Sequence, residues 1–150
     1  MDEITTSCVL LADRHHGLSE GIHGLLESVF STVFMVTDEA SLVEGARRLR
    51  PSVIVADLSL VPGDSLGFVR RLHEQAGGAK LVLLSVHDEL AVAQSVIAAG
   101  ADGIVLKRSI ATDLLSAIES LQGGSRYVSP AIASAFERAA DKTSGFAGRK

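Results

Sequence analysis

The chain has 150 residues, of which 47% are hydrophobic and 21% charged, so it suits one domain with one core and is not expected to be disordered over most of its length. Its net charge of −4 makes this domain a poor candidate for binding nucleic acid through phosphate contacts. The single cysteine, Cys8, excludes an internal disulfide, and no apolar run reaches the length of a membrane span. We therefore expect a soluble cytoplasmic protein with no membrane partner.

Short apolar runs alternate with helix-like patterns five times along the chain. The runs are continuous, as in strands buried on both faces of a parallel sheet, and the other segments carry apolar residues at helical spacing. The predicted strands are residues 8–12, 33–36, 53–57, 81–84 and 104–106, and the predicted helices are residues 18–29, 42–49, 66–72, 90–99 and 114–121. This alternation predicts an α/β fold, a doubly wound five-stranded parallel sheet with helices on both faces.

Three local signals indicate where helices begin and end. Ser41 and Glu44 have the spacing of a capping box at the start of the second helix. Asp88 is expected to cap the start of the fourth helix, and Gly100 is expected just beyond its C-terminal cap.

Four of the five predicted strands end on a polar side chain, namely Asp13, Asp57, Ser85 and Lys107. A single Asp at such a place is usually a turn former, and a single Lys is usually a solvated cation. Parallel strands, however, bring their carboxyl ends to one edge of the sheet, where open α/β proteins keep their chemistry. Two carboxylates, a hydroxyl and an ammonium group together suit phosphoryl transfer to Asp57, with a magnesium ion held between the carboxylates.

These strand ends resemble the receiver domain of bacterial two-component response regulators, which has the flavodoxin-like (CheY-like) fold with strand order 2-1-3-4-5. The resemblance covers about residues 7 to 121. It is carried by Leu11-Ala12-Asp13, Asp57-Leu58-Ser59-Leu60, Leu84-Ser85 and Gly103-Ile104-Val105-Leu106-Lys107.

The resemblance implies that a histidine kinase phosphorylates Asp57 and that Ser85 and Lys107 sense the phosphoryl group. It also implies that Mg²⁺ is held by Asp13, Asp57 and the backbone carbonyl of Ser59. No other cofactor is expected, and the protein is expected to act in signalling rather than as an enzyme.

The segment after the fifth predicted helix resembles the linker of NarL/FixJ-type (LuxR-type) regulators. We expect the receiver to span residues 1–123 and a linker with an extra C-terminal helix to span residues 124–150. That helix would start at Ser129-Pro130 and carry an apolar stripe of Ile132, Ala135, Phe136 and Ala139. In this subfamily a helix-turn-helix DNA-binding domain follows and controls transcription, and homodimers are usual. Here the chain ends where that domain would begin, as in an isolated receiver or a single-domain protein.

Arg14 departs from the family pattern, because receivers usually have two adjacent acidic residues after the first strand and this chain has Asp13-Arg14. A guanidinium group in that place is expected to weaken or abolish Mg²⁺ binding. Two interpretations stay open: Arg14 turns to solvent and a ligand is lost, or it approaches Asp57 and partly replaces the charge of the metal. Arg14 therefore keeps an alternative open, a phosphorylation-independent pseudo-receiver that serves as an interaction or dimerisation module.

Three histidines, His15, His16 and His87, lie near the same edge. We expect surface or loop roles for them, because two adjacent histidines do not face one site and no cysteine accompanies them. A flavin or nucleotide enzyme on the same fold ranks last, because no Gly-rich phosphate loop follows the first predicted strand.

Overall fold

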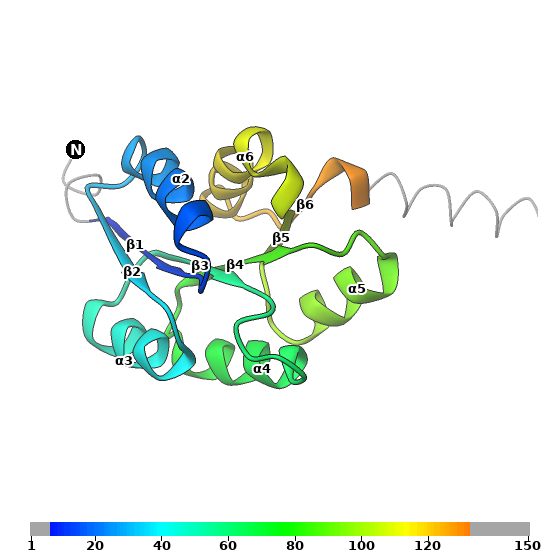
Figure 1. Cartoon of the computed structure of the whole chain (residues 1–150), viewed down its shortest axis with the longest axis horizontal. Helices are drawn as coiled ribbons and strands as arrows, with labels where there is room; N and C mark the ends of the chain where they lie inside the picture. The colour runs from blue at the N-terminus through cyan, green and yellow to red at the C-terminus, as the bar shows by residue number, and fades with distance from the viewer. Residues whose placement is uncertain (1–6, 133–150) are drawn as a thin grey trace, which may run out of the picture.

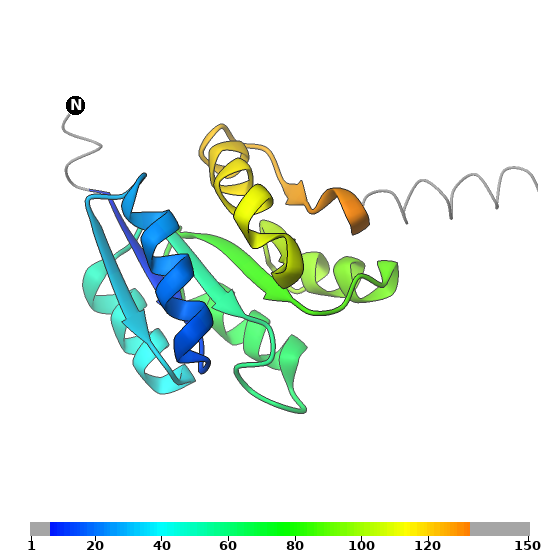
Figure 2. The same ribbon diagram turned by 45° about the horizontal axis from the view of Figure 1, so that its top comes forward.

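The continuous apolar runs become the strands of one parallel sheet. A computed structural model describes residues 7–132 of the chain (Figures 1 and 2). Its strands are β1 (Cys8–Ala12), β2 (Thr32–Val36), β3 (Val53–Asp57), β4 (Lys80–Ser85), β5 (Gly103–Leu106) and β6 (Tyr127–Val128), and their order in the sheet is β2-β1-β3-β4-β5-β6. Every pairing is parallel. The expected order of the first five strands is confirmed, and a sixth strand extends the sheet.

Helices cover both faces of this sheet, as the doubly wound prediction requires. They are α2 (His16–Glu27), α3 (Glu39–Leu49), α4 (Ser65–Gln75), α5 (Leu90–Ala98) and α6 (Ile110–Gln122), with a short 3₁₀ turn, η1 (Lys107–Ser109), between β5 and α6. Figure 1 shows α2 and α6 on one face and α3, α4 and α5 on the other. No helix within residues 7–132 combines the length and the apolar character that crossing a bilayer requires.

Each central strand supplies both cores, because successive side chains point to opposite faces of the sheet. Leu10, Ile54 and Leu83 pack into the core beneath α3, α4 and α5. Their chain neighbours, such as Leu11 and Val55, pack into the core beneath α2 and α6. Burial on both faces explains why these strands have continuous apolar runs rather than an alternating pattern.

The start of α3 differs from the sequence prediction. The cap is Asp38, whose carboxylate accepts a 2.7 Å hydrogen bond from the backbone N–H of Ser41. The expected capping box of Ser41 and Glu44 is therefore wrong, because Ser41 already lies in the first turn of a helix that begins at Glu39. An aspartate is favourable here because it also places negative charge at the positive end of the helix.

The start of α5 also differs, whereas its end agrees. Glu89, not Asp88, holds the N-cap position, and its side chain makes no capping hydrogen bond. The carboxylate of Asp88 accepts a 3.0 Å hydrogen bond from Arg108 instead. At the other end Gly100 follows the C-cap Ala99 with φ of +126°, a conformation that L side chains rarely adopt, so the expected role of Gly100 is confirmed.

Strand β6 is the element that the sequence pattern did not indicate. Tyr127 and Val128 pair with Gly103 and Ile104 of β5. The absence of a side chain at Gly103 permits this approach, because a Cβ atom there would lie only 3.3 Å from the carbonyl oxygen of Tyr127. Part of the segment expected as linker therefore belongs to the sheet.

A buried serine fixes the chain directly after β6. The Ser129 side chain is fully buried, and its hydroxyl accepts a 2.9 Å hydrogen bond from the N–H of Leu106 and donates one of 2.9 Å to Asp113 of α6. A helical turn follows at residues 130–132, and Ile132 is buried in the core beneath α3, α4 and α5. The rest of the expected apolar stripe, Ala135, Phe136 and Ala139, lies outside the described residues.

Candidate functional site

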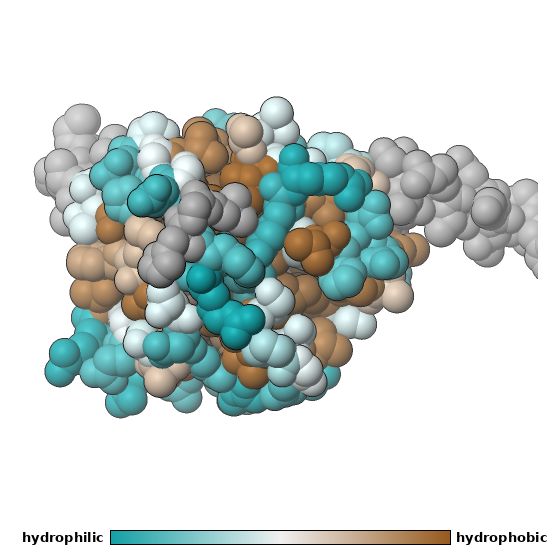
Figure 3. Space-filling model, in the orientation of Figure 1, coloured by the Kyte–Doolittle hydropathy of each residue, from teal (hydrophilic) through white to brown (hydrophobic). Residues whose placement is uncertain are grey.

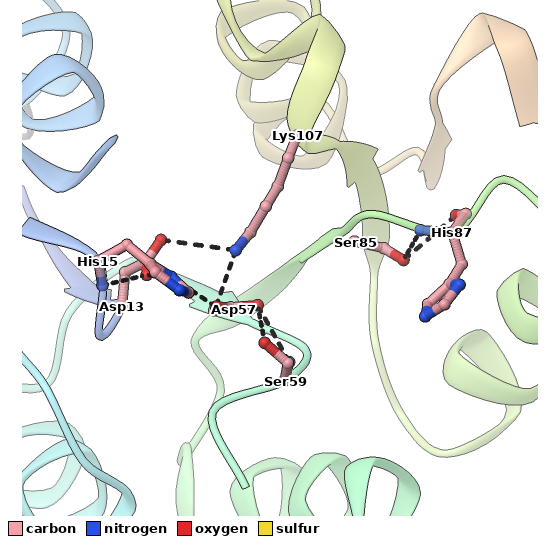
Figure 4. A network of polar contacts seen from close by, with 7 residues as sticks. All are labelled: Asp13, His15, Asp57, Ser59, Ser85, His87 and Lys107. Atoms are coloured by element: carbon pink, nitrogen blue, oxygen red, sulfur yellow. Dashed lines mark hydrogen bonds and ion pairs between the residues drawn. The ribbon is translucent and has the colours of Figure 1, made fainter. Parts of the chain in front are cut away.

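The carboxyl ends of β1, β3 and β5 bring three of the expected side chains together (Figure 4). Asp57 is the last residue of β3, Asp13 follows β1, and Lys107 follows β5. The Lys107 ammonium nitrogen lies 2.8 Å from Oδ2 of Asp57 and 4.0 Å from Oδ2 of Asp13. Both aspartates are only 2% exposed. The expected convergence of these positions is therefore present in the structure.

Asp57 is held in one orientation by its neighbours. The backbone N–H and the hydroxyl of Ser59 both donate to Oδ1 of Asp57, at 3.0 and 2.9 Å, while Lys107 donates to Oδ2. Burial alone would raise the pKa of Asp57, but the hydrogen bonds from Lys107 and Ser59 and the charge of Lys107 hold this pKa below its usual value. Asp57 is thus a buried carboxylate that stays ionised at neutral pH.

Ser85 lies at the end of β4 but does not touch Asp57. Its hydroxyl donates to the backbone carbonyl of His87 at 3.2 Å and accepts from the backbone N–H of His87 at 2.9 Å (Figure 4). Asp57 and Ser85 nevertheless line the same small hollow, with a volume of about 60 Å³, together with residues of the loops after β3 and β4. The hollow leaves space for a group between the carboxylate and the hydroxyl.

His15 lies beside the carboxylates, a position that sequence analysis did not predict for it. Its Nδ1 lies 3.1 Å from Oδ1 of Asp13 and 3.8 Å from Oδ2 of Asp57, although 61% of its side chain is exposed. The backbone N–H of His15 also donates to Oδ1 of Asp13 at 2.8 Å. An aspartate that accepts from the residue two positions later is a common turn, and this spacing was the available signal. His15 is a loop residue, as expected, but its ring faces the carboxylates.

The other two histidines do not join this group. The imidazole of His87 is exposed and lies 3.6 Å from Glu89. The side chain of His16 lies outside the described part of the structure.

Arg14 lies in solvent, as the first of the two interpretations expected. Its side chain is exposed. Among the described residues, the ion partners of Asp13 and Asp57 are Lys107 and His15, and Arg14 is not one of them. The positive charge beside Asp57 therefore comes from Lys107.

Figure 3 shows the surface of the molecule in the orientation of Figure 1. Hydrophilic residues form a band across the middle of the face, and apolar residues lie beside the band.

Comparison with known families agrees with this geometry. The model of the response regulator receiver domain matches residues 9–119. The chain belongs to the response regulator receiver family. Response regulators are signalling proteins and are generally not enzymes.

Several receiver proteins resemble the chain over most of its length. The response regulator UvrY of Escherichia coli K12 is 32% identical over 129 residues, which is 83% of this chain and 58% of UvrY. The chain thus spans little more than half the length of this relative. A LuxR-family two-component response regulator from Aurantimonas sp. SI85-9A1 is 30% identical, with a TM-score of 0.79 over 89% of this chain and 98% of that one.

A third likeness is the isolated REC domain of RcsB from Salmonella enterica serovar Typhimurium, solved in the presence of phosphomimetic BeF₃⁻. It is 25% identical, with a TM-score of 0.73 over 85% of this chain and 96% of that one. The relatives place this chain among receivers of LuxR-type response regulators.

Receiver domains typically bind Mg²⁺, and the donor groups at this edge fit a divalent cation. Oδ2 of Asp13 is buried and has no hydrogen-bond partner, and such an acceptor is costly unless a cation or proton donor meets it. Oxygen and nitrogen atoms of Asp13, His15 and Asp57 lie within 4.8 Å of one another. The two carboxylates carry two negative charges against the one positive charge of Lys107, so the site retains net negative charge for a cation.

Proposed function

We propose that this receiver accepts a phosphoryl group on Asp57 from a histidine kinase and thereby controls transcription through a DNA-binding output domain. The observation that carries this proposal is the buried carboxylate of Asp57, paired with Lys107 at 2.8 Å beside Asp13 and facing a hollow shared with Ser85. Each group has a separate part in phosphoryl transfer to a carboxylate.

In the proposed reaction a carboxylate oxygen of Asp57 attacks the phosphorus of a phosphohistidine. A P–O bond to Asp57 forms, and the P–N bond to the imidazole of the kinase breaks with its electron pair leaving on that nitrogen, which then takes up a proton. The lowered pKa of Asp57 keeps the attacking carboxylate ionised. Lys107 lies close enough to neutralise part of the charge on the phosphoryl oxygens.

Mg²⁺, held by Asp13, Asp57 and the backbone carbonyl of Ser59, would supply the remaining positive charge that the phosphoryl oxygens require. Ser85 responds to the new group by turning its hydroxyl from His87 toward a phosphoryl oxygen. That rotation gives up the 3.2 Å hydrogen bond to the carbonyl of His87, so the loop between β4 and α5 loses one of its anchors. We propose this loop as the first part of the fold to change on phosphorylation.

The proposed output follows from the relatives. RcsB, which is 26% identical in sequence with a TM-score of 0.76, has been solved as a complex with DNA. We propose that residues 124–150 lead toward a helix-turn-helix domain in the whole regulator, and that the receiver acts as a homodimer. Because this domain has a net charge of −4, DNA contacts belong to the output domain.

The test is treatment of the purified protein with acetyl phosphate and a divalent cation, MgCl₂ or CoCl₂ in separate samples, followed by intact-mass measurement. Wild type is expected to gain one phosphoryl group, whereas Asp57→Asn gains none. Asp64→Asn is a matched control, because Asp64 is an exposed aspartate in the loop that follows β3. A modified Asp57→Asn protein, or an unmodified wild type, would contradict the proposal. An unmodified wild type that still dimerises would instead support the pseudo-receiver alternative.

A further inference from the structure

The ring of His15 has no part in the proposed phosphoryl transfer, yet it faces both carboxylates of the site. We propose that Asp13, His15 and Asp57 form a mixed oxygen and nitrogen site that prefers a first-row transition ion such as Zn²⁺ or Co²⁺ to Mg²⁺. This inference rests on the proposed function only where it names the ion that assists phosphoryl transfer to Asp57. Metal binding itself is measured without phosphoryl transfer.

The distances agree with a shared ion. Two neighbouring ligands of one ion lie roughly 3 Å apart when each is about 2.1 Å from the metal. Nδ1 of His15 lies 3.1 Å from Oδ1 of Asp13 and 3.8 Å from Oδ2 of Asp57, so small rotations of exposed and buried side chains bring the three donors around one ion. Figure 4 shows the ring and the two carboxylates turned toward one another.

Burial gives an independent indication. The side chain of Asp13 is fully buried, and its Oδ2 accepts no hydrogen bond. The nearest cation, the ammonium group of Lys107, lies 4.0 Å from this oxygen, which is too far for a hydrogen bond. A buried carboxylate oxygen without a donor is expected to bind a cation, and a metal ion between Asp13 and Asp57 would meet it.

The donor types determine which cation is preferred. Mg²⁺ favours a full set of oxygen ligands in octahedral geometry, and the acidic residue that usually completes this set is replaced by Arg14, which lies in solvent. Imidazole nitrogen is a good ligand for Zn²⁺, Co²⁺ and Ni²⁺. The exposed ring of His15 can carry its proton on Nε2 toward water and present the Nδ1 lone pair to the ion.

The simpler explanation is that His15 only donates a hydrogen bond to Asp13 and binds no metal. The two explanations differ when ions are titrated into the metal-free protein and binding is followed by calorimetry and by the visible absorption of Co²⁺. We expect Co²⁺ and Zn²⁺ to bind the wild type with at least tenfold higher affinity than Mg²⁺, and Mg²⁺ in modest excess not to displace Co²⁺.

Variants at His15 separate the ligand role from a structural one. His15→Ala is expected to lose about tenfold or more in Co²⁺ affinity while its weak Mg²⁺ affinity stays unchanged. His15→Asp restores an oxygen donor and is expected to reverse the preference toward Mg²⁺. His23→Ala is the matched control, since His23 lies on α2 and pairs with Glu27, and it should bind Co²⁺ like the wild type.

Equal Co²⁺ affinity in the wild type and His15→Ala, or displacement of Co²⁺ by an equal concentration of Mg²⁺, overturns the inference. Its failure is distinguishable from failure of the proposed function. Phosphorylation of Asp57 that depends on Mg²⁺ alone, without a transition-metal preference, refutes only the inference. Tight Co²⁺ binding without any phosphorylation of Asp57 refutes only the proposed function.

Discussion

Replacing Ser129 by alanine removes a buried hydroxyl that joins β5, α6 and the segment after β6. In the wild type this hydroxyl accepts from the N–H of Leu106 and donates to Asp113, each at 2.9 Å. Alanine fits the space but removes the acceptor of the Leu106 N–H and the donor to Oδ2 of Asp113. The substitution therefore tests how firmly residues 127–132 are attached to the domain.

The magnitude follows from the groups left behind. A buried donor or acceptor that loses its partner costs about 1–3 kcal/mol. Leu106 is fully buried, whereas Asp113 is 7% exposed and keeps a 3.1 Å hydrogen bond from Thr112. The lost hydrogen bond to Asp113 therefore costs less free energy than the one from Leu106. We expect Ser129→Ala to lower the free energy of unfolding by about 2–4 kcal/mol, which lowers Tm by roughly 5–12 °C for a chain of this size.

The assay is urea unfolding followed by far-ultraviolet circular dichroism. Ser116→Ala is the matched control, because Ser116 is an exposed serine on α6 and its loss should change the free energy by less than about 0.5 kcal/mol. In a double-mutant cycle, Ser129→Ala combined with Asp113→Ala should cost less than the sum of the single changes. A Ser129→Ala protein as stable as Ser116→Ala, or strictly additive effects in the cycle, would refute the reasoning.

Two further substitutions have contrasting expected effects on stability. Gly100→Ala should lower the free energy of unfolding by about 1–3 kcal/mol in urea titrations, because Gly100 has φ of +126° and a Cβ atom there would meet the His73 ring at 2.6 Å. Gly21→Ala on α2, where a Cβ atom meets nothing within 4 Å, should raise the free energy of unfolding by up to about 1 kcal/mol. Equal effects of the two glycine substitutions would contradict the conformational argument. Asp38→Ala should lower Tm at pH 7 because the backbone N–H of Ser41 holds the pKa of Asp38 below its ordinary value of 3.8. Since that pKa is lowered on folding, the stabilisation by the Asp38 carboxylate is present above pH 3.8 and is lost as the pH falls through the folded pKa. The difference in Tm between wild type and Asp38→Ala should therefore shrink near pH 2. A difference in Tm that stays constant with pH would exclude this account.

The central sheet and the convergence of its polar strand ends followed from local sequence pattern. The run of residues 53–57 is apolar up to a single carboxylate, and parallel strands share an edge, so Asp57 and Lys107 were expected to meet. That expectation needed only the alternation of elements and the handedness of their connections. The fold class itself brings the carboxyl ends of the strands to one edge, so the long-range contact between Asp57 and Lys107 needed no separate signal.

The parts that were not predicted depend on choices between similar local signals. Asp38 and Ser41 both offer a capping oxygen three residues apart, and only the observed start of α3 decides between them. β6 has two residues, too few for any periodicity, and Gly103, which lacks a side chain, permits its close approach to β5. The contact of His15 with the carboxylates was not predicted, because the turn at Asp13 that brings its exposed ring toward them leaves no hydrophobic pattern.

The two edges of the sheet differ in how easily another chain could extend them. On one side Tyr127 and Val128 occupy the pairing positions of β5, and the Ser129 hydroxyl takes the N–H of Leu106 that a longer strand would have used. On the other side β2 pairs only with β1 among the described strands, and its Met35 is 43% exposed. An unpaired strand edge is a template for strand addition between molecules. Among the described strands, the five-residue β2 therefore offers a longer edge for strand addition than the two-residue β6.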